Sequence, residues 1–125
     1  MIISGKILTI NGPKDVKDIR KTDWIVAGTF PSRIIDIKTV PVFSYISFNT
    51  VPDLKIGENT KINTLYGFAS VKDGEEATLI RPYTSPIVVK AKVYQSKKEL
   101  IGYVFTLRDG DRTIVLENCE VECDA

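Results

Sequence analysis

Residues 89–94, "VKAKVY", place two lysines and a tyrosine at alternate positions. Successive side chains of a β-strand point to opposite faces, so Lys90, Lys92 and Tyr94 would share one face of a strand. Cations bind phosphate groups, and an aromatic ring stacks on an unpaired base, each stacked base contributing roughly 1 to 3 kcal/mol. The segment therefore predicts a face that binds single-stranded nucleic acid, with an ordinary solvent-exposed face as the alternative.

The charges along the chain are unevenly distributed. No acidic residue occurs between Ala77 and Lys98, and Lys97 and Lys98 extend the basic segment. The C-terminal end is acidic instead, with Glu117, Glu120, Glu122 and Asp124. A net charge of +1 excludes a globally basic nucleic-acid-binding protein, so any such binding must use this local patch.

Residue types that usually carry catalysis are scarce. The chain contains no histidine, which removes the commonest general base and metal ligand. Cys119 and Cys123 would lie about 13 Å apart in an extended strand, too far for a disulfide, and we expect buried structural thiols. The carboxylate pairs Asp15 with Asp18 and Glu75 with Glu76 fall in expected loops or turns. No phosphate-binding loop, nucleophile elbow or metal-ligand spacing occurs, so we expect no enzymatic activity, no cofactor and no metal.

The clearest structural signal lies near the C-terminus. Asp109-Gly110 separates two apolar, β-branched runs, which predicts a type I′ hairpin over residues 102–122. Counting outward from this turn, Phe105 faces Ile114 and Val104 faces Val115.

Further strand-like segments precede this hairpin. From Trp24 onward they end at Pro31, Pro41 and Pro52, and a second hairpin is expected at the turn 72–75. Only residues 14–23 show weak helical spacing, enough for a single turn. Eight or nine short strands predict an all-β fold: a small closed or partly open antiparallel β-barrel, or alternatively a two-sheet β-sandwich.

The organisation of the chain is simple. Its length suits a single all-β domain over residues 1–125. No signal peptide or membrane span is recognisable, so we expect a cytoplasmic protein, or one within a virion assembled there, with no membrane partner. Many isoleucines and lysines, no histidine and one glutamine, Gln95, fit a thermophilic source.

Two segments resemble the oligonucleotide/oligosaccharide-binding (OB) fold. "SPIVVKAKVYQSKKELIGYVFTLRDGDRTIVLENCEVE" is similar to its first three strands, and "LKIGENTKINTLYGFASVKDGEEATLI", with its "G-x-x-x-K-I" entry, is similar to its later ones. They stand in the opposite order to the usual one. The resemblance implies single-strand binding through Lys90, Lys92, Tyr94, Lys97, Lys98, Tyr103 and Phe105.

A structural role is the competing hypothesis. A neutral chain with many hairpins could pair its edge strands with copies of itself and form a homo-oligomer, such as a viral particle or tail component. The segment "RTIVLENCEVE" resembles the closing strands of viral tail-tube subunits. The expected partner is therefore single-stranded nucleic acid or, alternatively, another copy of the chain.

Overall fold

The computed structural model describes residues 1–28, 30–108 and 112–123. These residues contain twelve β-strands, one 3-10 turn (Val16–Asp18) and no α-helix. The all-β prediction is therefore confirmed. The strands are β1 (Ile2–Ser4), β2 (Lys6–Thr9), β3 (Gly12–Asp15), β4 (Trp24–Ala27), β5 (Phe30–Phe48), β6 (Val51–Ile56), β7 (Ile62–Thr64), β8 (Gly67–Ala69), β9 (Glu76–Leu79), β10 (Ile87–Leu107), β11 (Thr113–Val115) and β12 (Glu120–Glu122).

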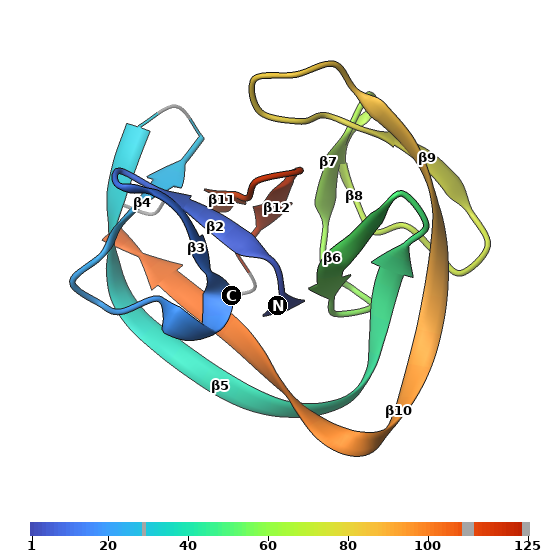
Figure 1. The fold of residues 1–125 in the computed structure, drawn as a ribbon, viewed down its shortest axis with the longest axis horizontal. Helices are drawn as coiled ribbons and strands as arrows, with labels where there is room; N and C mark the ends of the chain where they lie inside the picture. Colours follow the sequence, from blue (N-terminus) through green and yellow to red (C-terminus); the bar gives the residue numbers. More distant parts are fainter. Residues whose placement is uncertain (29, 109–111, 124–125) are drawn as a thin grey trace.

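Two long antiparallel strands, β5 and β10, form the frame of the molecule. Their register runs from Ala91 opposite Phe48 to Leu107 opposite Ile34, with an irregularity between Gln95 and Leu100. Figure 1 shows the pair curving together along the bottom of the view and rising on both sides. This irregularity is where β10 bends, as β-bulges commonly cause.

The prolines do not end the strands as predicted. Pro31 and Pro41 lie inside β5, and Pro52 lies inside β6. Pro31 is the second residue of its strand, and Pro41 pairs with Ile101 just beside the irregularity in β10. A missing N–H is tolerated at strand starts and next to bulges, so β5 continues through both positions.

The predicted C-terminal hairpin is wrong. β11 pairs with β12, with Ile114 opposite Val121, whereas Phe105 of β10 lies opposite Ile37 of β5. The Asp109-Gly110 turn itself lies outside the described residues. At Tyr103 the strand β10 is already paired with β5 on one edge and with β1 on the other. Neither edge is left there for β11.

Shorter strands complete two arms on this frame. β4 and β2–β3 extend the first part of β5, while β9 and β7–β8 extend the first part of β10. The predicted turn at residues 72–75 is present, with the N–H of Glu75 bonded to the carbonyl of Lys72 at 3.0 Å. However, its flanking strands β8 and β9 both pair with β7. The single predicted helical turn is the 3-10 turn, where the Asp15 side chain accepts from the N–H of Lys17.

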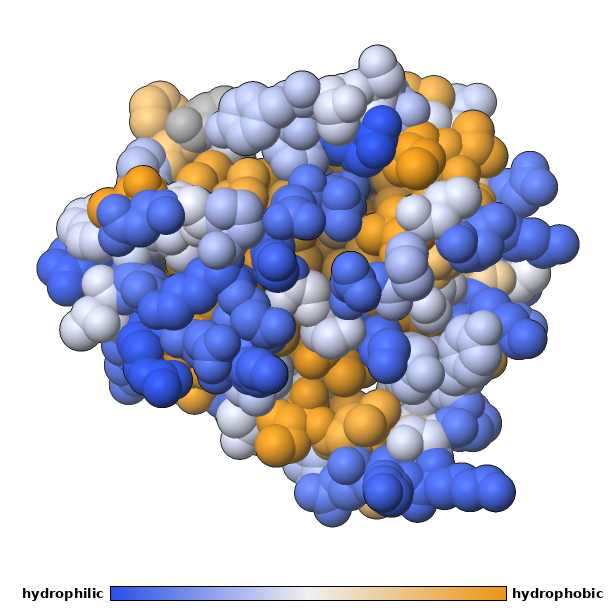
Figure 2. Space-filling model, viewed as in Figure 1, coloured by the Kyte–Doolittle hydropathy of each residue, from blue (hydrophilic) through white to orange (hydrophobic). Residues whose placement is uncertain are grey.

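The buried residues form one cluster between the arms, mostly isoleucine, leucine and valine. Figure 2 shows a largely hydrophilic face with an apolar area over the lower part of β5 and β10. Phe43 and Ile101 are among the exposed apolar side chains of those strands. Within the described residues, no helix is long and apolar enough to span a membrane.

Candidate functional site at the ends of the described chain

The first residue is bound by a short loop, residues 57–61, which we call the terminal loop. The Met1 amine donates to the Thr60 hydroxyl at 2.9 Å, and this hydroxyl donates to the Met1 carbonyl at 3.2 Å. The same carbonyl accepts from the N–H of Gly57 at 3.0 Å. Thr60 is only 2% exposed. The Met1 carbonyl thus faces two hydrogen-bond donors in a site shielded from solvent.

The terminal loop also binds the last strand of the described chain. The N–H of Glu122 donates to the carbonyl of Lys61 at 2.9 Å, and Val121 pairs with Ile62. Cys123 follows directly, and its N–H binds the carbonyl of Arg112. In Figure 1 the N-terminus lies in the space between the two arms, where β12 also lies. Met1 and Glu122 are therefore both bound by the terminal loop.

Gly57 leaves room for the close approach of Met1. A Cβ atom at this position would lie 3.2 Å from the Thr60 Oγ1 and 3.4 Å from the Met1 Cβ. The loop closes on itself through the N–H of Thr60, which donates to the carbonyl of Gly57 at 3.1 Å. A residue without a side chain lets the backbone N–H reach the Met1 carbonyl.

A cleft of about 440 Å³ opens beside the terminal loop. A segment of β5 forms one wall and the loop forms the other, with Met1 between them. Its lining residues are Met1, Pro41, Val42, Phe43, Ser44, Gly57, Glu58, Asn59 and Thr60.

The two cysteines differ in their surroundings. Cys119 is fully buried, and burial, with a smaller contribution from the nearby Glu120 carboxylate, raises the pKa of its thiol to about 12. Cys123 is half-buried at the end of β12. No disulfide joins them. Because the thiolate is the reactive form of cysteine, Cys119 is chemically inert near neutral pH, which leaves Cys123 as the candidate nucleophile.

The arrangement fixes the position of the first residue. The Gly57 N–H and the Thr60 hydroxyl both donate to the Met1 carbonyl oxygen, so they hold the backbone of Met1 in place. Among the described residues, no group of three or more Cys, Asp or Glu side chains could hold a metal ion.

The structure places the predicted binding residues in different environments. Lys90, Lys92 and Tyr94 are exposed and Val89 and Ala91 buried, so the predicted alternation is confirmed. Lys97 and Lys98 are exposed beside the bend in β10.

The other two predicted binding residues belong to the interior. Tyr103 is half-buried against the core, and Phe105, 2% exposed, lies within it. Phe105 therefore cannot stack on a base. The face of β10 that carries Phe105 packs on the core, which the OB-fold resemblance did not indicate.

Met1, Gly57 and Thr60 were missed as functional residues. The segment "GENTKI" was noticed for its "G-x-x-x-K-I" pattern, which was assigned to a barrel strand. Only the contact between Met1 and Thr60, which are 59 positions apart, indicates a role for this segment. Nothing in the sequence near residue 57 indicates that contact.

Comparisons with known proteins relate this geometry to one fold. No family model and no curated protein matches the chain. Among solved structures, it resembles a bacterial intein-like domain from Clostridium thermocellum, with a TM-score of 0.74, 18% identity, and 98% of this chain and 97% of that one covered. The gp41-1 intein gives 0.69 and 15%, with 99% of both chains covered. A variant of the AceL NrdHF class 3 split intein gives 0.70 and 13%, with 100% and 97% covered. The chain therefore has the fold of inteins.

This fold overturns five predictions. The resemblances to OB-fold domains and to tail-tube subunits are wrong, since the similar structures are inteins over nearly their whole length. Single-stranded nucleic-acid binding, predicted from residues 89–94 as well as from the OB-fold resemblance, is contradicted by the same similarity, and so is a virion structural role. The expectation of no enzymatic activity is also contradicted, because one similar structure is described as a splicing domain and another as a splice-inactive variant.

Proposed function

We propose that this chain is an intein-like processing domain that rearranges the polypeptide backbone at its own N-terminal end. The observation that carries the proposal is the terminal loop, which binds both Met1 and β12. The similarity to inteins over 97% or more of each compared chain supports it. A domain that acts on its own ends needs those ends at one site.

The similar inteins indicate which groups matter. The splice-inactive AceL NrdHF intein has one cysteine and one asparagine replaced by alanine, and a gp41-1 intein variant has its first-position cysteine replaced by alanine. Met1, the residue that the terminal loop binds in the present chain, has a side chain that carries no nucleophile. Acyl transfer at this end therefore needs a nucleophile from elsewhere in the chain, and Cys123 follows the strand that the terminal loop binds.

The chemical step can be written for a polypeptide that continues before Met1. The Cys123 thiol attacks the carbonyl carbon of the residue that precedes Met1, and a thioester to the Cys123 Sγ forms. The peptide bond to the Met1 nitrogen breaks, and the thiol proton passes to the departing amine. Water then hydrolyses the thioester, which releases the upstream carboxylate and restores the thiol.

The test is a fusion protein with a small marker domain placed before Met1. We expect hydroxylamine to release the marker as its hydroxamate, identified by mass spectrometry, because hydroxylamine attacks thioesters far faster than peptide bonds. Cys123→Ala should abolish release. Cys119→Ala is the matched control, since it removes the buried thiol instead. This variant should still release the marker, provided that circular dichroism shows it to be folded.

Two results would contradict the proposal. One is a fusion that stays intact under these conditions although it is folded. The other is a Cys123→Ala fusion that releases the marker as fast as the parent.

A further inference from the structure

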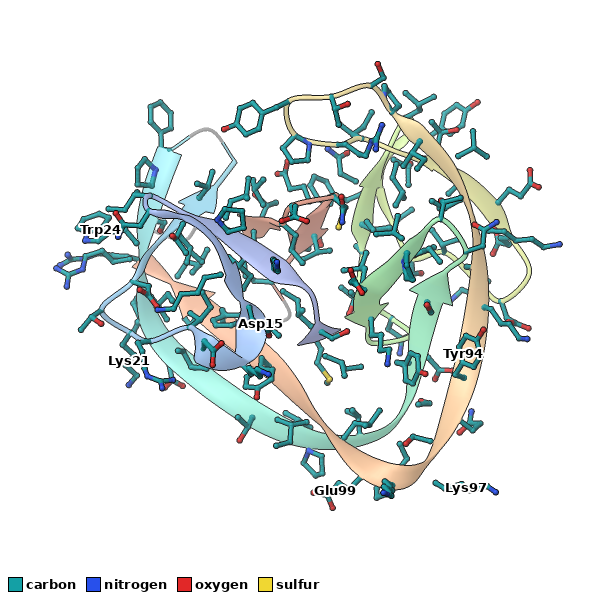
Figure 3. The ribbon with its side chains drawn as sticks, viewed as in Figure 1. Asp15, Lys21, Trp24, Tyr94, Lys97 and Glu99 are labelled. Atoms are coloured by element: carbon teal, nitrogen blue, oxygen red, sulfur yellow. The ribbon has the colours of Figure 1, made fainter. Side chains whose placement is uncertain are left out.

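A second set of residues, far from Met1 in sequence, forms an ordered surface on β5, β6 and β10. The rings of Tyr45 and Tyr94 are stacked, with centroids 5.5 Å apart and planes 20° from parallel. The Lys55 ammonium lies 4.9 Å from the Tyr45 centroid, and the Lys92 ammonium lies 5.1 Å from that of Tyr94. We call these four residues the cation–tyrosine surface. Figure 3 shows Tyr94 on β10, with Lys97 farther along the strand at the bend.

The β-ladder explains this order. Tyr94 lies directly opposite Tyr45, while Ser47 lies opposite both Lys92 on β10 and Lys55 on β6. Directly opposed side chains on one face of a sheet are close enough to contact each other. The register therefore places two ammonium groups and two rings together on the solvent side of three neighbouring strands.

A hollow of about 470 Å³ adjoins this surface. Phe48 and Ala91, both buried, contribute apolar lining, and the exposed Lys90 and Lys92 also line it. Its volume lies within the range of ligand-binding pockets in proteins. The lining residues are Ser47, Phe48, Asn49, Pro52, Asp73, Gly74, Lys90, Ala91, Lys92 and Tyr94.

Hydrogen bonds hold the walls of the hollow in place. The Asn49 side chain accepts from the N–H of Lys90 at 2.9 Å, and the Asp73 carboxylate accepts from the N–H of Val93 at 2.8 Å. The N–H of Gly74 donates to the carbonyl of Ala91 at 2.9 Å. These bonds fix the backbone that carries the lysines, so binding would cost little ordering of the site.

The charges indicate the chemistry of the partner. Three lysines (Lys55, Lys90 and Lys92) surround the rings and the hollow. They outnumber the two nearby carboxylates, that of Asp73, which already accepts from the N–H of Val93, and that of Glu76, which lies opposite Lys90 on β9. An acidic partner is thus complementary to this face. Each tyrosine ring is already stacked on the other and has an ammonium group 4.9 or 5.1 Å from its centroid, so part of each ring is covered before any partner binds.

We propose that the cation–tyrosine surface and its hollow bind an acidic peptide segment in which an apolar side chain is flanked by carboxylates. The apolar side chain would enter the hollow above Phe48 and Ala91. The flanking carboxylates would pair with Lys90 and Lys92. This binding does not depend on the processing chemistry at Met1.

The test uses a fluorescein-labelled pentapeptide, Glu-Glu-Phe-Glu-Glu, titrated with the full chain and followed by fluorescence anisotropy. We expect the double variant Lys90→Gln, Lys92→Gln to weaken binding at least about ten-fold, since two charge pairs are lost. The double variant Lys97→Gln, Lys98→Gln makes the same change in charge at the bend, outside the hollow. It should change the affinity less than about two-fold, because exposed charges outside a contact contribute little.

Further measurements separate the alternatives. The peptide Lys-Lys-Phe-Lys-Lys should not bind, and Glu-Glu-Ala-Glu-Glu should bind more weakly than the phenylalanine peptide. Equal weakening by the two double variants would overturn the proposal, because it would indicate attraction by net charge alone. It would also be overturned by no peptide binding, by tighter binding of a labelled oligothymidine, or by a dimer in light scattering that Lys90→Gln, Lys92→Gln dissociates.

Discussion

The terminal loop and the cation–tyrosine surface are two candidate sites built in different ways. The terminal loop binds Met1 through backbone groups and one buried hydroxyl, that of Thr60. The cation–tyrosine surface consists of side chains on the solvent face of long strands, such as Tyr94 at 40% exposure. The terminal loop depends on contact between three segments that are distant in sequence. The cation–tyrosine surface depends on residues that lie opposite each other on paired strands.

This difference determines how each site should respond to substitution. Removal of a buried hydroxyl leaves its hydrogen-bond partners unsatisfied and out of contact with water, which lowers the free energy of unfolding. A side chain on a solvent-exposed sheet face can be replaced with little effect on folding. Changes at the terminal loop should therefore act mainly on stability, while changes at the cation–tyrosine surface should act mainly on binding and lower stability only slightly.

The largest expected effect compares two aromatic residues of β10. Phe105→Ala should lower the free energy of unfolding by about 3 to 5 kcal/mol, because it opens a cavity in the core beside Ile37. Tyr94→Ala should cost only about 0.5 to 1.5 kcal/mol, the contribution of one exposed aromatic contact. Urea denaturation followed by circular dichroism measures both. Equal losses would show that the cation–tyrosine surface is part of the structural core.

An intermediate effect is expected for two threonines. Thr60→Val keeps the shape of the side chain but removes both hydrogen bonds to Met1, and should cost about 1 to 3 kcal/mol. Thr50→Val is the control, since the exposed Thr50 hydroxyl makes one long bond of 3.4 Å to the carbonyl of Val88; it should cost under about 0.5 kcal/mol. Similar unfolding midpoints for the two variants would contradict the role given to Thr60.

The smallest effect concerns Asp23, which belongs to neither site. Burial raises the pKa of its carboxyl, but the N–H of Arg20 at 2.7 Å and the Lys14 ammonium at 3.0 Å lower it more. Its pKa in the folded state thus lies below the ordinary value of 3.8. The resulting stabilisation is present above that pH and is lost as the pH falls through the folded-state pKa.

Asp23→Asn should therefore lower the unfolding free energy at pH 6 by under about 1 kcal/mol, a typical value for such a pair. The difference from the parent should shrink below pH 3.8. Asp36→Asn, which removes a more exposed pair with Lys21 at 3.6 Å, is the control and should have no measurable effect. Peptide binding should be unchanged in both variants. A difference between parent and Asp23→Asn that grows as the pH falls would contradict the sign of this shift.

The alternation of apolar and polar residues along the chain predicted part of the fold. Alternation placed Lys90, Lys92 and Tyr94 on one exposed face and Val89 and Ala91 on the other, because the two-residue period is a property of any strand. The all-β class followed from the same signal. The Asp109-Gly110 hairpin was mispredicted because a turn signal does not exclude competition for the edges of β10, which β5 and β1 occupy at Tyr103.

The candidate sites were predictable to different degrees. The cation–tyrosine surface was partly visible, since two of its four members, Lys92 and Tyr94, lie in "VKAKVY". Tyr45 and Lys55 join them only through strand pairing. The terminal loop was not recognised, because Thr60 acquires its role from contact with Met1.

The sequence by itself determined the all-β class and which side chains of residues 89–94 face solvent, because alternation and β-branching act between near neighbours. It also determined that no imidazole is present and that Met1 carries no nucleophile. Only the tertiary structure decided that the terminal loop binds Met1 and β12 together, and that β10 pairs with β5 along most of its length. Those contacts join segments tens of residues apart, and the choice among competing strand edges depends on burial of the whole core.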